Sequence, residues 1–143
     1  MPCIALAAAK RRTSTMSYTI DRIIDDADFD AIEARTRAAL SNHGFGVLTE
    51  IDVQATMKKK IDVDMDAYKI LGACNPNMAH QAIGIEPRVG AMLPCNVILR
   101  AVEGGIEVSA IDPLASMEAI DNAELKSVAG QVREMMQAVV AEI

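Results

Sequence analysis

The chain contains no tryptophan, and aromatic residues of all kinds make up 3% of its 143 positions. A core cannot be built from so few rings, so it must consist of aliphatic side chains together with the nine methionines. Methionine fills irregular gaps in a core and also suits adaptable interfaces. At this length one domain can bury such a core without metal or disulfide staples.

Basic charge is also scarce, because 14 Lys and Arg residues stand against 20 Asp and Glu, for a net charge of −6. Nucleic-acid binding needs a basic surface that replaces the counterions of the phosphate backbone. The one basic run after residue 12 is Lys58-Lys59-Lys60, which we interpret as a solvated helix face. We therefore expect no nucleic-acid partner.

Secretory and membrane-spanning signals are missing as well. The apolar run of residues 2–9 precedes Lys10-Arg11-Arg12, whereas a secretory signal has its charges first, and the run is too short to cross a bilayer. Three cysteines, an odd number, indicate a reducing compartment. We expect a cytoplasmic protein with no membrane partner. Residues 1–16 are predicted to be a disordered tail or a misassigned start, and residues 17–143 a single domain.

Common catalytic motifs are absent, since the sequence has no Ser-His-Asp arrangement, phosphate loop or dinucleotide fingerprint. Residues 62–66 resemble the opening of a calcium loop. However, Ala67 and Ala73 stand where that loop requires glycine and glutamate, so it fails. Whether the protein is an enzyme is left open, and we lean towards a protein that is not one.

Apolar spacing and capping residues predict an α+β fold. Helix starts are expected after Asp28, Asp52 and Asn75, and a capping box of Asp121 with Glu124 opens the last helix. The order β-α-β-(α)-β-(α)-β-β-α indicates an antiparallel sheet with helices packed on one face. The predicted strands cover 18–24, 45–51, 68–74, 92–103 and 106–112.

The pair Gly104-Gly105 predicts a two-residue hairpin loop, because both glycines can adopt positive φ. That loop would place Val97 opposite Asp112 on the core face of the sheet. The other face would be more solvated but still apolar around Ile98 and Val102. A mean hydropathy of +0.18 is high for a small chain, so we expect a homodimer that covers this surface.

Two cysteines are predicted to meet at one edge of the sheet. Cys74 ends the third strand and Cys95 begins the fourth, and if these strands are antiparallel neighbours their thiols share a corner, both in phase with core residues. The register places Asp112 diagonally opposite Cys95, roughly 7–8 Å away. The helix that starts at Pro76 would lower the pKa of a nearby thiol.

This corner is a tentative metal or thiol site made of Cys74, Cys95, Asp112 and His80, suited to zinc or another soft transition metal. The alternative is that both cysteines are small apolar core residues. A second hypothesis is a dimer that binds a small apolar or acidic ligand in a cleft of at least roughly 300 Å³. Its tentative walls are Met57, Met78, Met92 and Met135.

A third hypothesis is an enzyme that uses Cys74 as its nucleophile. Such an enzyme needs a base within hydrogen-bond reach of the thiol. The sequence offers two histidines for that role, His43 and His80. We rank a binding module first and an enzyme last.

Several motifs together resemble the bacterial and archaeal domain of unknown function 302 family, over about residues 17–143. The resemblance implies an α+β sheet with helices on one side, similar to a TATA-binding-protein half-domain, and it implies dimers. It carries no catalytic residues, although the family is associated with sulfur-handling proteins and both Cys74 and Cys95 match its cysteine positions. The matching segments are 44–53, 68–76 and 93–95, with Lys60, Ala79 and Asp112-Pro113.

Overall fold

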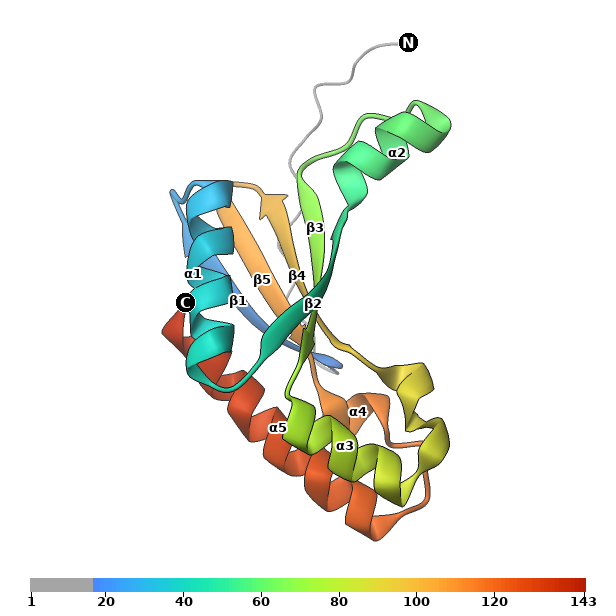
Figure 1. Ribbon diagram of the computed structural model, residues 1–143. Coiled ribbons are helices and arrows are strands. Elements are labelled where there is room, and N and C mark those ends of the chain that lie inside the picture. Colours follow the sequence, from blue (N-terminus) through green and yellow to red (C-terminus); the bar gives the residue numbers. More distant parts are fainter. Residues whose placement is uncertain (1–16) are drawn as a thin grey trace.

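The computed structural model describes residues 17–143 (Figure 1). The predicted tail of residues 1–16 lies outside the described residues. In chain order the elements are β1 (Thr19–Asp25), α1 (Phe29–Asn42), β2 (Gly46–Asp52), α2 (Val53–Ile61), β3 (Tyr68–Cys74), α3 (Pro76–Ile85), the 3-10 helix η1 (Pro87–Met92), β4 (Cys95–Val102), β5 (Gly105–Ile111), α4 (Pro113–Ser116) and α5 (Ala123–Glu142).

The five strands form one antiparallel sheet in the order β1-β5-β4-β3-β2. The α+β prediction and the pairing of β3 with β4 are therefore confirmed. Strand β1 returns to pair with β5, so the beginning of the chain closes one edge of the sheet, and β2 forms the other edge. This order places the end of β3 beside the start of β4.

Helices α1 and α5 pack on one face of the sheet (Figure 1). The alternation of burial along β4 identifies this face, because Val97 and Leu99 are fully buried whereas Ile98 and Arg100 remain partly exposed. Successive strand residues point to opposite faces, so the opposite face of the sheet carries Ile98 and Arg100. We call it the open face, since α1 and α5 lie on the other side (Figure 1). It is partly exposed at Ile98 and Arg100, although Glu107 and Ser109 opposite them on β5 are buried.

The hairpin between β4 and β5 differs from the prediction. Its loop is Glu103-Gly104, and Val97 pairs with Ala110 instead of Asp112. Gly104 takes the positive φ of +77° that the turn needs. Gly105 belongs to the strand, where a Cβ would collide with the carbonyl oxygen of Ile24 on β1, so glycine is required by close packing there. A shift of two residues leaves each side chain on its expected face.

Three of the four predicted helix starts are confirmed. The side chains of Asp28, Asp52 and Asn75 cap α1, α2 and α3 by accepting a backbone N–H three residues on. The fourth was misplaced by one residue, because Asn122, not Asp121, caps α5 by accepting from the backbone N–H of Leu125 at 3.0 Å. The predicted fourth strand was also too long, since residues 87–92 form η1.

Candidate functional site

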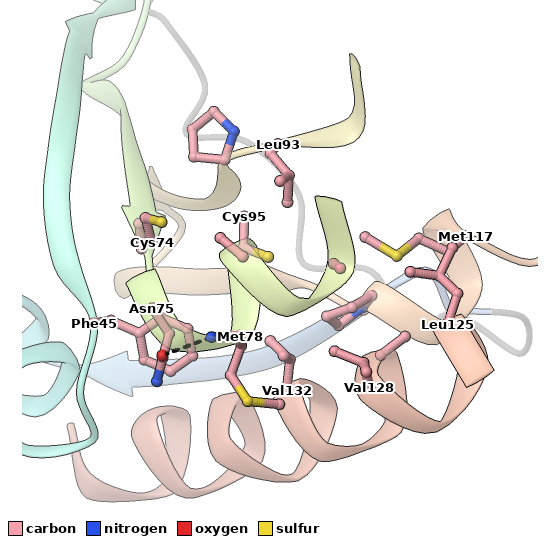
Figure 2. Close-up of a pocket in the computed structure, with 16 residues that line it drawn as sticks. Phe45, Cys74, Asn75, Met78, Leu93, Cys95, Met117, Leu125, Val128 and Val132 are labelled. Carbon is pink, nitrogen blue, oxygen red and sulfur yellow. Dashed lines mark hydrogen bonds between the residues drawn. The ribbon is translucent and has the colours of Figure 1, made fainter. Parts of the chain in front are cut away.

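A small cavity lies where β3 ends and β4 begins, beneath α3 and beside α5 (Figure 2). Its volume is about 30 Å³, and among the described residues that line it none is charged. Both predicted thiols, Cys74 and Cys95, belong to its wall. Phe45, Met78 and Val132 add apolar surface from the start of the second strand, from α3 and from α5.

The strand register explains why the two thiols meet. Cys95 pairs across the strands with Ala73, so Cys74 lies one residue beyond that pair, at the end of β3. Cys95 is 8% exposed and shares the helix-covered face with Ala73, as predicted. Cys74 is half-buried and out of phase with the buried Leu71 and Ala73, so its predicted core phase is wrong. It reaches the cavity from the strand end.

Helix α3 begins immediately after Cys74 because Asn75 and Pro76 form an efficient start. The Asn75 side chain accepts the backbone N–H of Met78 at 3.2 Å, and Pro76 occupies the first helical position, where no N–H is required. Gly44, at a φ of +82°, turns the chain tightly beside Asn75, and a Cβ there would lie 3.1 Å from the Asn75 amide nitrogen. The turn before β2 thus packs against the mouth of the site.

Burial and, to a lesser extent, the nearby Cys74 raise the pKa of Cys95 to about 11. The predicted lowering of the thiol pKa by the start of α3 therefore does not hold for Cys95. An apolar environment disfavours the charged thiolate, which is both the nucleophile and the metal ligand. At neutral pH Cys95 is a protonated, weakly polar group.

Asp112 lies near the cavity, because its neighbour Pro113 is part of the wall. The Asp112 carboxylate is engaged elsewhere. One oxygen accepts the backbone N–H of Leu114 at 2.9 Å and starts α4, and the other accepts Nε of Arg133 on α5 at 2.9 Å. Asp112 thus has a structural role that ties β5 and α4 to α5.

The two histidines lie away from the thiols. His80 is exposed on α3, and Nε2 of His43 lies 3.1 Å from Oε1 of Glu142 at the end of α5. Neither residue is part of the described cavity wall. Within residues 17–143, no group of three or more His, Cys, Asp and Glu side chains is arranged to hold a metal ion. The predicted metal ligands are therefore not gathered into one site within residues 17–143, and neither histidine shares the described cavity wall with Cys74.

The four predicted cleft methionines are dispersed. Met78 lines the cavity, Met135 packs against the core, and Met57 and Met92 are exposed on α2 and η1. Sequence reasoning missed Met117, which lines the cavity from the segment after α4. The signal was Asp112-Pro113, the same cap-and-proline pattern as Asn75-Pro76, which starts the short helix α4.

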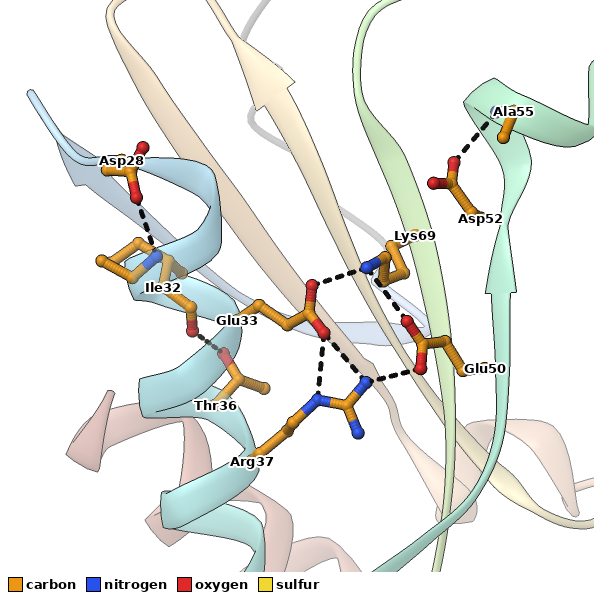
Figure 3. Close-up of polar contacts among 10 residues, drawn as sticks. Asp28, Ile32, Glu33, Thr36, Arg37, Glu50, Asp52, Ala55 and Lys69 are labelled. Carbon is orange, nitrogen blue, oxygen red and sulfur yellow. Dashed lines mark hydrogen bonds and ion pairs between the residues drawn. The ribbon is translucent and has the colours of Figure 1, made fainter. Parts of the chain in front are cut away.

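Four charged side chains form a network between α1 and the strands β2 and β3, away from the cavity (Figure 3). Glu33 and Arg37 of α1 meet Glu50 of β2 and Lys69 of β3, with N···O distances between 2.7 and 3.0 Å. Hydrogen bonds to Glu33 and Glu50 raise the pKa of Lys69. The network ties the edge strand β2 and its neighbour β3 to α1.

The comparisons with known proteins address the family and the fold. The family model described as "Domain of unknown function DUF302" matches residues 21–143. The crystal structure of an uncharacterized conserved DUF302 protein from Bacillus stearothermophilus is similar, with a TM-score of 0.83 and 20% identity over 89% of this chain and 98% of that one. No curated protein matches the chain. In residues 17–143, every helix is too short or too polar to cross a membrane.

Proposed function

Because this chain belongs to the DUF302 family, whose description assigns no activity, we propose a function from the geometry: it is a homodimeric binding module that holds a small, soft ligand between Cys74 and Cys95. The observation that supports this proposal is the placement of both thiols in one cavity with an uncharged wall. The reducing conditions of the cytoplasm, where we place the protein, would keep both thiols free.

The wall restricts the chemistry of the ligand. A charged organic ligand would be buried without a countercharge, at a large cost in free energy. A cavity of about 30 Å³ admits a small group, since one water molecule needs roughly 10–15 Å³ on the same measure. Small uncharged groups, apolar or containing sulfur, meet both conditions.

A soft transition-metal ion is the second candidate, favoured by four sulfur atoms in the same wall. Met78 and Met117 contribute thioethers beside the two thiols. Thiol and thioether ligands select monovalent copper, whereas zinc requires four nitrogen, oxygen or thiolate ligands. Because the Asp112 carboxylate is bound to Arg133 and His80 is exposed on α3, copper fits the available donors better than zinc. Binding would displace the proton of Cys95, so copper affinity would rise with pH.

Native mass spectrometry of protein purified under reducing conditions, without chelator, tests both candidates. A mass surplus present in the wild type and lost in both Cys74→Ala and Cys95→Ala would support the proposal and identify the ligand. Met92→Ala is the matched control, because it removes an exposed sulfur atom that is not in the described cavity wall, and it should retain the surplus.

Copper and xenon then probe the wild type directly. Monovalent copper, buffered by a competing chelator, should raise the melting temperature of the wild type and leave Cys95→Ala unchanged. Xenon, a small apolar atom, should shift the amide resonances of cavity residues if the ligand is uncharged. A wild type without mass surplus, copper retention or xenon response would contradict the proposal.

A homodimer is the second part of the proposal. The described surface exposes several large apolar side chains, among them Leu48, Ile51 and Ile61, and a second copy could cover them. Of the surface expected from the sequence, Ile98 is partly exposed and can contribute, whereas Val102 is only 4% exposed and cannot. Light scattering of the purified chain at micromolar concentration should give a dimer mass, and a monomer at high micromolar concentration would contradict it.

A further inference from the structure

Residues 51–66, which we call the arm, extend beyond the end of the sheet. They comprise the end of β2, the helix α2 and the loop to β3. In Figure 1 α2 projects away from α1 and α5. None of the residues of α2 is buried, in contrast to α1, α3 and α5. The arm is the part of the described chain that is least covered by the rest of the fold.

The arm has an apolar side nonetheless. Val53, Met57 and Ile61 recur at every fourth position and therefore share one face of α2. Ile61 is 62% exposed, and Ile51 and Val63, at the two ends of the arm, are 46% and 44% exposed. A helix of nine residues is marginal in water without tertiary packing. A stripe of this kind is typical of a helix that packs against a partner.

The base of the arm is firmly held. Lys69 and Glu50 of the charge network flank it on β3 and β2 and tie both strands to α1 (Figure 3). Within the arm, Nε2 of Gln54 donates to the carbonyl oxygen of Met65 at 2.9 Å, which joins the helix to the returning loop. The arm is thus presented in a defined direction, with its stripe uncovered.

We propose that the arm docks on a second copy of this chain, with Met57 and Ile61 packing on the open face of the partner's sheet in a two-fold symmetric dimer. This inference rests on the proposed homodimer and assigns its surface. The open face has an apolar surface for this contact, because Ile51, Ile70 and Ile98 lie side by side across β2, β3 and β4. In such a dimer the arm of each chain would pack on the open face of the other chain.

Charge favours a second copy as the occupant. The arm carries a basic turn, Lys58-Lys59-Lys60, followed by an acidic loop with Asp62 and Asp64. Lys58 joins the two within one chain, at 2.9 Å from Asp62 and 3.2 Å from Asp64, yet both aspartates remain more than half exposed. In a two-fold symmetric contact the same patch meets itself, so a patch with both a basic turn and an acidic loop can place each against the other's opposite charge.

The test compares two exposed isoleucines by sedimentation velocity over a range of concentrations. Ile61→Glu on the arm should raise the dimer dissociation constant at least tenfold, because it places a carboxylate in the apolar contact. Ile83→Glu, 43% exposed on α3, is the matched control and should leave the dissociation constant unchanged. Circular dichroism of both variants should match that of the wild type, since neither side chain is buried.

A second variant distinguishes loss of the contact from loss of the helix α2. Val63→Glu lies beyond α2, so it disturbs the contact without affecting helix formation, and it should also weaken the dimer. Zero-length cross-linking of mixed isotope-labelled and unlabelled chains should join Lys59 or Lys60 of one copy to the acidic loop of the other.

The outcomes separate the two proposals. A monomeric wild type would overturn both the homodimer and the arm contact. A dimer that tolerates Ile61→Glu and Val63→Glu would overturn the arm contact and leave the homodimer standing. Cross-links confined to single chains would likewise count against the two-fold arrangement.

Discussion

The two ends of β3 have opposite surroundings. At one end Ala73 is fully buried, Cys74 lines the cavity, and α3 follows and packs back on α5. At the other end Tyr68 leads back to α2, which has no buried residue. Both helices are short and carry an apolar stripe, so amphipathicity alone does not decide whether a helix joins the core. The long helix α5 reaches past one end of the strand and supplies the surface that α3 needs.

The largest expected difference is between side chains of similar size, one in the core of β3 and one on the arm. Leu71→Ala, at a fully buried position of β3, should lower the free energy of unfolding by about 2–5 kcal/mol. Ile61→Ala, on the arm, should lower it only where the protein concentration supports a dimer. Urea denaturation at several protein concentrations measures both effects. An Ile61→Ala effect that is large and independent of concentration would show that the arm belongs to the monomer core.

The next effect is a dependence of stability on pH at the cavity end. Burial raises the pKa of Cys95 from 9.0 to about 11, so the native state favours the protonated thiol. This contribution is complete below pH 9 and is lost as the pH rises to about 11, a loss of roughly 2–3 kcal/mol. Cys95→Ala should flatten the decline in melting temperature between pH 9 and pH 11. An unchanged decline would mean that Cys95 is more solvated than its burial indicates.

The smallest effect compares the caps of the two short helices. Asn75→Ala, which removes the cap of α3, should lower the global free energy of unfolding by about 1 kcal/mol. Asp52→Ala removes the corresponding cap of α2 at 2.9 Å from Ala55 N, yet α2 can open without exposing the core. For Asp52→Ala we expect faster amide hydrogen exchange within α2 and little change in the global free energy of unfolding. If both variants lowered the global free energy of unfolding equally, α2 would be as much a part of the folded core as α3, which contradicts this comparison.

Much of the architecture could be predicted because its signals are local. Asp28, Asp52 and Asn75 were identified as caps from residue type and position alone, and strand alternation identified Val97 and Leu99 as core residues. The hairpin register failed for a non-local reason. Gly105 looks like a turn glycine in the sequence, but it is needed in the strand because β1 passes close to it.

The candidate site was predictable in part. That the ends of β3 and β4 would bring Cys74 and Cys95 together followed from antiparallel pairing. The engagement of Asp112 by Arg133 could not be foreseen, because it depends on how α5 crosses the sheet. The dispersal of the four methionines has the same origin, since the spacing of a stripe does not indicate what the stripe will face.

By itself the sequence determined the five strands and the longer helices, that the core is aliphatic, and which strand ends carry thiols, because propensity, capping and alternation act over a few residues. The tertiary structure alone decided that Cys95 is buried enough to stay protonated, that the Asp112 carboxylate is bound to Arg133, and that α2 is left uncovered. These properties depend on which distant surfaces meet, and burial and packing are set by the whole fold.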